Sequence, residues 1–260
     1  MIDASAALLL AGAGFAGGVV TSMVGGASLI TFPALIAAGL PPIIASASNT
    51  VAMTPSSFVA AAAARKRLPA WRPAFRRIVV VSLLGSAAGA TLLLLTPERA
   101  FMTLVPVLIG LATLLFAFSP HIHRWTFRHG DDPALHTARA DRIGLVLLGP
   151  VAVYIGFFGA GAAIMLLAIL SLGHTGDFRT VNALKNLIAG FMSVVAIVIF
   201  VVSGLVAWPH AAAMCVGGIA GGLVGERLVR VVPAVVVRWV VIVVGCVMTW
   251  VYAQKYWVGQ

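Results

Sequence analysis

Charged side chains are scarce in this sequence, and acidic ones are the scarcest. Only 9% of the 260 residues are charged, with 7 Asp or Glu against 17 Lys or Arg, while 61% are apolar. The mean hydropathy is +1.08. A water-soluble domain of this composition lacks the polar side chains needed to cover its surface. The sequence therefore predicts an integral membrane protein.

Motifs for catalysis and cofactor binding are also missing. There is no P-loop, no HExxH motif and no Ser-His-Asp arrangement, which argues against ATP-driven transport by this chain. Cys215 and Cys246 lie in apolar segments without metal-ligand spacing, so we expect neither a disulfide framework nor a zinc site. The histidines between 121 and 136 are irregularly spaced, which disfavours a metal site there. We expect no enzymatic activity and no cofactor.

Ten apolar segments alternate with short breaks rich in Gly, Pro or Arg. Their lengths suit α-helices, and the period-2 alternation of a transmembrane barrel is absent. Two segments are too short to cross a membrane alone, and each follows a glycine cluster. The predicted helices cover residues 4–24, 28–38, 43–64, 75–95, 100–118, 142–158, 162–172, 179–203, 210–226 and 234–254.

The chain repeats itself at an offset of about 134 to 137 residues. The matched positions are glycines, tryptophans and prolines that occur in the same order in both halves, which indicates two copies of one unit. The matches are Gly25 with Gly159, Gly39 with Gly173, Trp71 with Trp208, Gly85 with Gly221, Gly89 with Gly225 and Pro97 with Pro233.

Basic residues predict how the two copies are oriented. Placing the basic loops in the cytoplasm puts 14 Lys and Arg residues inside and leaves two outside. Equivalent loops then lie on opposite sides of the membrane. The predicted fold is an all-α polytopic membrane protein with two inverted repeats, 1–118 and 142–260, joined by a cytoplasmic loop over 119–141. Each repeat should contain a re-entrant helical hairpin with a glycine apex plus three transmembrane helices.

Lys185 lies within the apolar segment that begins near Arg179. An ionised Lys in the hydrocarbon layer costs about 2.5 kcal/mol or more unless an anion, water or a polar cavity compensates its charge. The alternative is that its amine snorkels back to the headgroups near Arg179. Asn182 and Asn186 flank it on the same segment, and these amides favour contact with a substrate.

Polar residues also follow one face of the equivalent segment in the first half, including Ser48, Asn49 and Thr50. The two polar faces should meet across the pseudo-two-fold axis. A lone cation among amide and hydroxyl groups suits a small oxyanion, because these groups donate hydrogen bonds to anionic oxygen. The alternative is that the Asn and Ser side chains only join neighbouring helices.

Two glycine clusters mark the predicted apices. Gly25 and Gly26 precede the short segment that starts at Ser28, and Gly159 and Gly161 precede the one that starts at residue 162. A glycine break lets the short helix point its N-terminus, the positive end of its dipole, at an anion. Close packing of helices is the alternative role for these glycines.

Several of these motifs together resemble the sulfite exporter TauE/SafE family of bacterial membrane proteins. They are the run 22–33, the Gly39-Leu-Pro that follows it, the second glycine cluster, the run 177–186 with its Asn-Ala-Leu-Lys-Asn core, and the glycines of 217–225. The resemblance spans nearly the whole chain. It departs from the family's double glycine at Ala160, so the two apices need not be equivalent.

The resemblance implies a secondary transporter that exports sulfite or organosulfonates, such as sulfoacetate, across the bacterial plasma membrane. The expected partners are this small anion and the lipid bilayer. No basic-aromatic interleaving suggests nucleic acid, and a homodimer is left open. The alternatives are a non-transporting membrane assembly factor and a permease for another small anion or a metal. Metal uptake is disfavoured because every carboxylate falls at the end of an apolar segment or in a loop.

Overall fold

The computed structural model describes residues 2–23, 26–63, 65, 73–129, 138–160, 162–173, 178–228 and 234–258. These parts of the chain form helices joined by short connections. In chain order they are α1 (Ala4–Met23), α2 (Ser28–Ala37), α3 (Pro42–Ala63), α4 (Pro73–Leu95), α5 (Glu98–His129), α6 (Ala138–Phe157), α7 (Ala162–Gly173), α8 (Phe178–Val202), α9 (Trp208–Leu228), α10 (Ala234–Ala253) and the π-helical turn η3 (Gln254–Val258).

These helices confirm the ten predicted segments within a few residues, except at the C-terminal end of α5. The connector between the halves therefore differs from the prediction. The loop expected over 119–141 is shorter, because α5 continues to His129 and α6 already begins at Ala138. The apolar run does end near Phe118. The helix continues beyond it with polar residues, so the end of hydrophobicity is not the end of the helix.

Five described helices contain a stretch long and apolar enough to cross a membrane. The short helix α2 has 10 residues, which span about 15 Å, half of a hydrocarbon layer roughly 30 Å thick. It therefore cannot cross the membrane alone. The five stretches are Ala4–Ser22, Phe75–Leu95, Glu98–Phe118, Thr180–Val202 and Val236–Val258.

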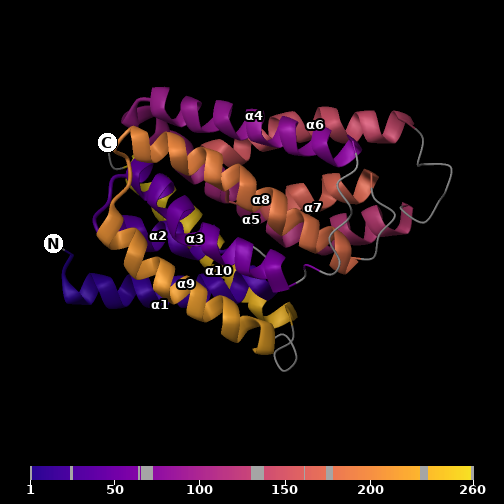
Figure 1. The fold of residues 1–260 in the computed structure, drawn as a ribbon. Helices are drawn as coiled ribbons and strands as arrows, with labels where there is room; N and C mark the ends of the chain where they lie inside the picture. The colour runs from indigo at the N-terminus through magenta and orange to yellow at the C-terminus, as the bar shows by residue number, and fades with distance from the viewer. Residues whose placement is uncertain are drawn as a thin grey trace.

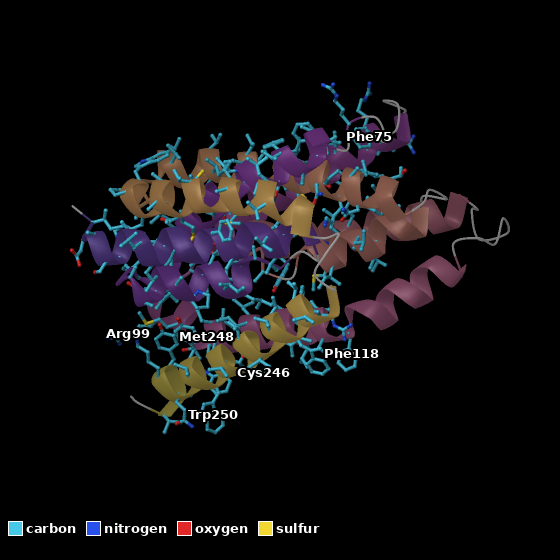
Figure 2. The ribbon with its side chains drawn as sticks, turned by 90° about the horizontal axis from the view of Figure 1, so that it is seen from below. Phe75, Arg99, Phe118, Cys246, Met248 and Trp250 are labelled. Carbon is cyan, nitrogen blue, oxygen red and sulfur yellow. The ribbon has the colours of Figure 1, made fainter. Side chains whose placement is uncertain are left out.

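The outer surface of the bundle is apolar. Trp250 on α10 is 67% exposed and points away from the other helices, with Cys246 on the same helix also exposed (Figure 2). Leu95 and Val202, at the ends of α4 and α8, are exposed to a similar degree. In water such an apolar surface would favour aggregation, whereas in a membrane the lipid chains solvate it.

The helices of the two halves interlock instead of forming separate bundles. The most extensive contacts join α1 with α9 and α4 with α6, and these pairs lie along opposite edges of the molecule (Figure 1). The helices α3 and α8 also pack together, as do α5 and α10. In the predicted repeat, α1 to α5 correspond in order to α6 to α10. Exchanging each helix for its counterpart converts the pair of α1 and α9 into the pair of α6 and α4. The same exchange returns the pairs of α3 with α8 and of α5 with α10. The packing thus has the pseudo-two-fold pattern that the repeated glycines indicate.

Glycines allow the backbones of α1 and α9 to touch. A Cβ on Gly14 would collide with the carbonyl of Met214, and one on Gly18 would collide with that of Gly218. The contacts move toward the C-terminus along both helices, from Gly14 to Gly18 on α1 and from Met214 to Gly218 on α9, so α1 and α9 are parallel. A Cβ on Gly89 of α4 would collide with the α6 backbone in the same way. Small residues permit this close approach of membrane helices.

The counterpart helices α5 and α10 run antiparallel to one another. Near the start of α5, the carbonyl of Thr103 accepts a hydrogen bond from Trp257 Nε1 at 3.1 Å, beyond the end of α10. Further along α5, the carbonyl of Ala117 accepts a hydrogen bond from Arg238 Nη2 at 3.4 Å, near the start of α10. These two equivalent helices therefore point in opposite directions.

Candidate functional site

Lys185 is buried in the structure. Only 4% of its surface is exposed, and its Nζ donates a hydrogen bond to Asn182 Oδ1 at 2.8 Å. This bond runs along α8, since Asn182 lies one turn before Lys185. No carboxylate pairs with the ammonium among the described residues, so a positive charge lies inside the protein without a counter-charge. Such a group needs an anion or water to offset its desolvation.

Asn186 lies one residue after Lys185 on α8 and is 7% exposed. The structure gives its side chain no hydrogen-bond partner in the described part of the chain. Its amide donors, together with those of Asn182, lie on the helix that carries the buried cation. The second half thus carries two amides and one buried cation on the same helix, and the printed bond joins the cation to Asn182.

Asn49 has a different environment, because both ends of its amide are bound within the protein. Its Oδ1 accepts a hydrogen bond from Thr31 Oγ1 at 2.6 Å, and its Nδ2 donates to Ser28 Oγ at 3.2 Å. Thr31 and Ser28 belong to α2, whereas Asn49 belongs to α3. Asn49 therefore fastens the short helix α2 to α3.

Ser48 and Thr50, the neighbours of Asn49, bind backbone groups. Ser48 is fully buried, and its Oγ accepts a hydrogen bond from the backbone N–H of Ala207 at 2.9 Å, just before α9. The Thr50 hydroxyl donates to the carbonyl of Ser46 at 3.1 Å. Ser48 and Asn49 thus bind other elements of the protein, whereas the Thr50 bond stays within α3.

The two glycine breaks differ in their surroundings. Gly26 has a φ of +90°, and a Cβ there would lie 2.8 Å from the Phe116 ring. Gly159 has a φ of +74° and lies two residues after the end of α6 at Phe157. Both values lie in the left-handed region, where glycine carries no steric penalty. The other two predicted apex glycines, Gly25 and Gly161, lie outside the described residues.

Aromatic residues connect the two breaks, which the sequence did not reveal. The ring of Phe32 on α2 packs edge to face against Phe158, with centroids 5.1 Å apart. Tyr154 donates from its hydroxyl to the carbonyl of Ala160 at 2.8 Å and so fixes the second break. The pair Phe157 and Phe158 ahead of the glycine was the one sequence signal for this contact.

The predicted site residues form two groups in the structure. Lys185 and Asn182 are joined by a hydrogen bond, and Asn49 is joined to Ser28. In the described part of the chain, no hydrogen bond connects one group with the other. The helices α3 and α8 do pack together, and they do so through the Phe58 ring, which covers Gly190.

The fold is a bundle of apolar helices, and Lys185 is buried in it without a carboxylate partner among the described residues. These features place the chain in the class of polytopic membrane proteins with polar groups in the interior. Within this class, a family model described as "Sulfite exporter TauE/SafE" matches residues 10–251. The chain therefore belongs to this family of membrane transporters.

Curated relatives carry names that agree with this assignment. A "Probable membrane transporter protein" of Haemophilus influenzae is 29% identical over 244 residues, which cover 91% of this chain and 90% of the relative. The "Probable membrane transporter protein YfcA" of Escherichia coli K12 is 27% identical over 239 residues, which cover 89% of this chain and 84% of the relative. No solved structure matches the chain. The comparisons support a multi-pass membrane transporter.

Proposed function

We propose that this protein is a secondary transporter that exports small sulfur-containing anions across the bacterial plasma membrane. Sulfite and organosulfonates such as sulfoacetate are the substrates. The observation that carries the proposal is the buried Lys185, which is hydrogen-bonded to Asn182 and has no counter-charge among the described residues. A small anion at Lys185 compensates this charge, and the family's description names sulfite.

In the proposed site, Lys185 supplies the positive charge and the amides of Asn182 and Asn186 supply neutral donors. Hydrogen bonds from such donors to an ionised oxygen are stronger than those between neutral groups. The N-terminal ends of the short helices α2 and α7, after the glycine breaks, add the positive ends of two helix dipoles. Ser48 and Asn49 contribute by holding the elements that shape the site, and Thr50 lies beside them on α3 with its hydroxyl bonded to the carbonyl of Ser46.

We further propose that residues 1–118 and 142–260 are inverted-topology repeats, with α1–α2 and α6–α7 as re-entrant hairpins. The antiparallel arrangement of the counterparts α5 and α10 supports this proposal. So does the distribution of basic residues, 14 on one side and two on the other. Transporters built in this way bind substrates near the bilayer midplane, where broken helices end.

Export of an anion needs no coupled ion if the cell interior is electrically negative. A membrane potential contributes about 2.3 kcal/mol per charge per 100 mV in the outward direction. The test is efflux from proteoliposomes loaded separately with sulfite, sulfoacetate or sulfate, at a set potential. We expect efflux of sulfite or sulfoacetate that exceeds the leak from empty liposomes and rises as the interior becomes more negative. Equal rates with and without the protein would contradict transport and favour a role in assembly.

A further inference from the structure

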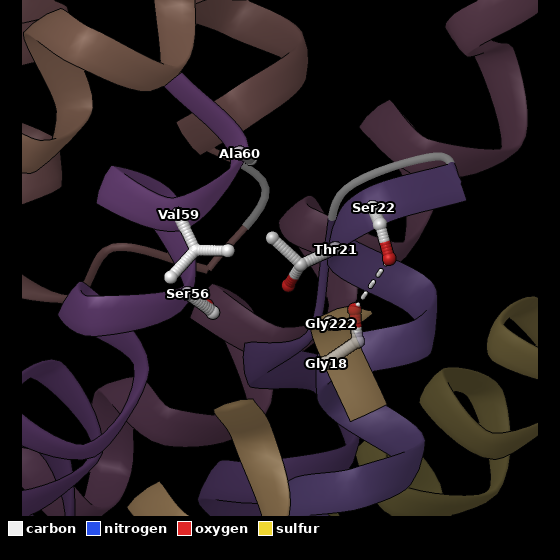
Figure 3. A pocket seen from close by; sticks show the side chains of 7 residues that line it. All are labelled: Gly18, Thr21, Ser22, Ser56, Val59, Ala60 and Gly222. Atoms are coloured by element: carbon white, nitrogen blue, oxygen red, sulfur yellow. Dashed lines mark hydrogen bonds between the residues drawn. The ribbon is translucent and has the colours of Figure 1, made fainter. Parts of the chain in front are cut away.

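The small cavity between α1, α3 and α9 carries no charge that could hold a ligand (Figure 3). Ser22 and Ser56 already donate their hydroxyl protons to helix carbonyls, at 2.9 and 2.7 Å. The rest of the lining is Thr21 with glycine, alanine and valine, and the space suits about one water molecule. A charged ligand away from Lys185 therefore needs a different site.

Arg238, near the start of α10, has hydrogen-bond donors that the protein does not satisfy. Its Nη2 donates to the carbonyl of Ala117 on α5 at 3.4 Å, which is longer than the usual range of about 2.7–3.2 Å. Its Nε is buried and has no hydrogen-bond partner among the described residues. A guanidinium has five N–H donors, so one long bond leaves most of them available. Because Nε is enclosed, the edge formed by Nη1 and Nη2 is the one that can receive an anion.

Exposed aromatic residues adjoin Arg238 and Ala117 in the sequence. Trp239 follows Arg238 on α10, Phe118 follows Ala117 on α5, and each of these two aromatic residues is exposed by more than half. Figure 2 shows Phe118 at the start of α10, opposite the end that carries Trp250. Tryptophan is enriched at the headgroup level of membranes, because its ring is apolar and its N–H is polar. This end of the helix pair thus has the composition of a membrane interface.

The apolar stretches of both helices stop at this end. That of α5 ends at Phe118, and that of α10 begins at Val236, two residues before Arg238. At a rise of about 1.5 Å per residue, the Arg238 backbone lies roughly 3 Å inside the boundary of the apolar stretch. Its long side chain can therefore reach a headgroup. In the proposed orientation this end is cytoplasmic, where anionic lipids give the membrane a negative surface.

The opposite end of the same helix pair is joined by a neutral donor. There Trp257 Nε1 donates to the carbonyl of Thr103 at 3.1 Å. At an offset of 136 residues, within the range of the repeat, Arg238 corresponds to Met102. The bond from α10 to α5 is therefore charged at the proposed cytoplasmic end and neutral at the other end.

From these observations we propose that Arg238 binds the phosphate of an anionic phospholipid between α5 and α10. The Nη1 and Nη2 edge donates to two phosphate oxygens, a geometry that guanidinium groups favour. Trp239 and Phe118 contact the apolar part of the same lipid. Basic pockets between transmembrane helices are known to take such headgroups. Only 17% of the most apolar part of α10 is buried, the lowest share of the five stretches, so a lipid bound to both helices would hold α10 against the bundle.

The test counts the lipids bound to the purified, delipidated protein by native mass spectrometry. We expect one phosphatidylglycerol to bind per chain more tightly than the rest, and phosphatidylcholine with the same acyl chains to bind more weakly. Arg238→Gln should weaken the affinity for this first phosphatidylglycerol by about tenfold or more, as expected for a lost charge-assisted hydrogen bond. Inorganic phosphate should not displace the lipid, because it lacks the acyl chains that add apolar contacts.

Two variants control for the loss of one positive charge. Arg99→Gln removes an exposed arginine near the start of α5, at the opposite end of the helix pair, and should leave the affinity unchanged. Arg230→Gln removes a charge eight residues before Arg238 and should weaken the affinity less than Arg238→Gln does. If Arg238→Gln fails to fold, Arg238→Lys takes its place. Lysine keeps the charge but loses the contact with two oxygens, so the affinity should still fall several-fold.

Equal affinities for phosphatidylglycerol and phosphatidylcholine would overturn the proposal. Equal losses in Arg238→Gln and Arg230→Gln would also overturn it, by assigning the binding to the summed charge of this region. Full displacement of the lipid by inorganic phosphate would reject it in favour of a site for soluble anions. The measurement contains no sulfur anion and no transport step. Its failure therefore leaves the proposed anion transport intact, and a failure of sulfite efflux leaves the lipid site intact.

Discussion

The hydrogen bond between Lys185 and Asn182 determines what each side chain can still offer to a substrate. Asn182 accepts this bond with its carbonyl oxygen, so within the described part of the chain both N–H groups of its amide remain as donors. The ammonium has three N–H donors, of which this bond uses one. An anion beside this pair would therefore meet donors and positive charge together. A cation at the same place would meet repulsion.

Substitution of Lys185 separates anion binding from snorkelling. We expect Lys185→Met to abolish most sulfite binding while raising the thermal midpoint, because it removes an ionised group from the protein interior. Lys185→Arg should keep part of the affinity with altered selectivity, since the guanidinium is larger and planar. Binding is measured by calorimetry on the purified protein.

The matched control for this series is Lys255→Met, which removes an exposed lysine from η3. This variant should bind sulfite as the parent protein does. Unchanged affinity in Lys185→Met would reject Lys185 as a ligand, whatever the effect on stability.

Asn49 and Asn186 are similarly buried, but replacing each by alanine should affect different properties. The first change should mainly lower stability, and the second should mainly weaken anion binding. Asn49→Ala removes both hydrogen bonds between α3 and α2, leaving Ser28 without this partner and Thr31 with only the carbonyl of Ala27, and should lower the free energy of unfolding by about 1–3 kcal/mol. Asn186→Ala removes no hydrogen bond found in the described residues, so it should change stability less and weaken anion binding by roughly 1–3 kcal/mol. Thermal unfolding and calorimetry on both variants test this difference. Equal losses of stability would contradict it.

Among the elements, the helices could be predicted from the sequence and many of their contacts could not. Apolar runs of helical length, broken by Gly and Pro, marked all ten helices. The bond from Asn49 to α2 was not predictable, because its partners lie 18 and 21 residues away and depend on how the hairpin folds back. The meeting of Phe32 with Phe158 joins different halves and likewise depends on tertiary packing.

The second break between helices depends on the backbone of Gly159. Its φ of +74° costs a side-chain-bearing residue roughly 1–2 kcal/mol. Gly159→Ala should therefore lower stability by about that amount, and Gly159→Leu should also abolish transport while membrane insertion persists. Gly12→Ala in α1 is the matched control, because an added Cβ there has open space. It should be neutral or slightly stabilising. Full transport by Gly159→Leu would show that this glycine is only a packing residue.

At the scale of the whole molecule, the pseudo-two-fold packing places two unlike chemistries in equivalent halves. The second half carries the buried cation at Lys185, whereas the equivalent part of the first half is occupied by Asn49 holding α2. The polar residues at matching positions of the two halves therefore have different roles in the structure, although the helices that carry them pack in matching pairs.

The orientation of the repeats in the membrane is the prediction that tests this architecture as a whole. In a variant without Cys215 and Cys246, single cysteines replace Arg67 or Arg128 on one side, and Ser203 or Glu98 on the other. The first two should react with an impermeant thiol reagent only from the cytoplasmic side, because basic loops stay inside. Ser203→Cys and Glu98→Cys should react only from outside, since equivalent loops of inverted repeats face opposite sides. Labelling of the 65–77 and 203–210 regions from the same side would require a parallel duplication instead, in which α5 and α10 could not both cross the membrane in the antiparallel arrangement that their hydrogen bonds define.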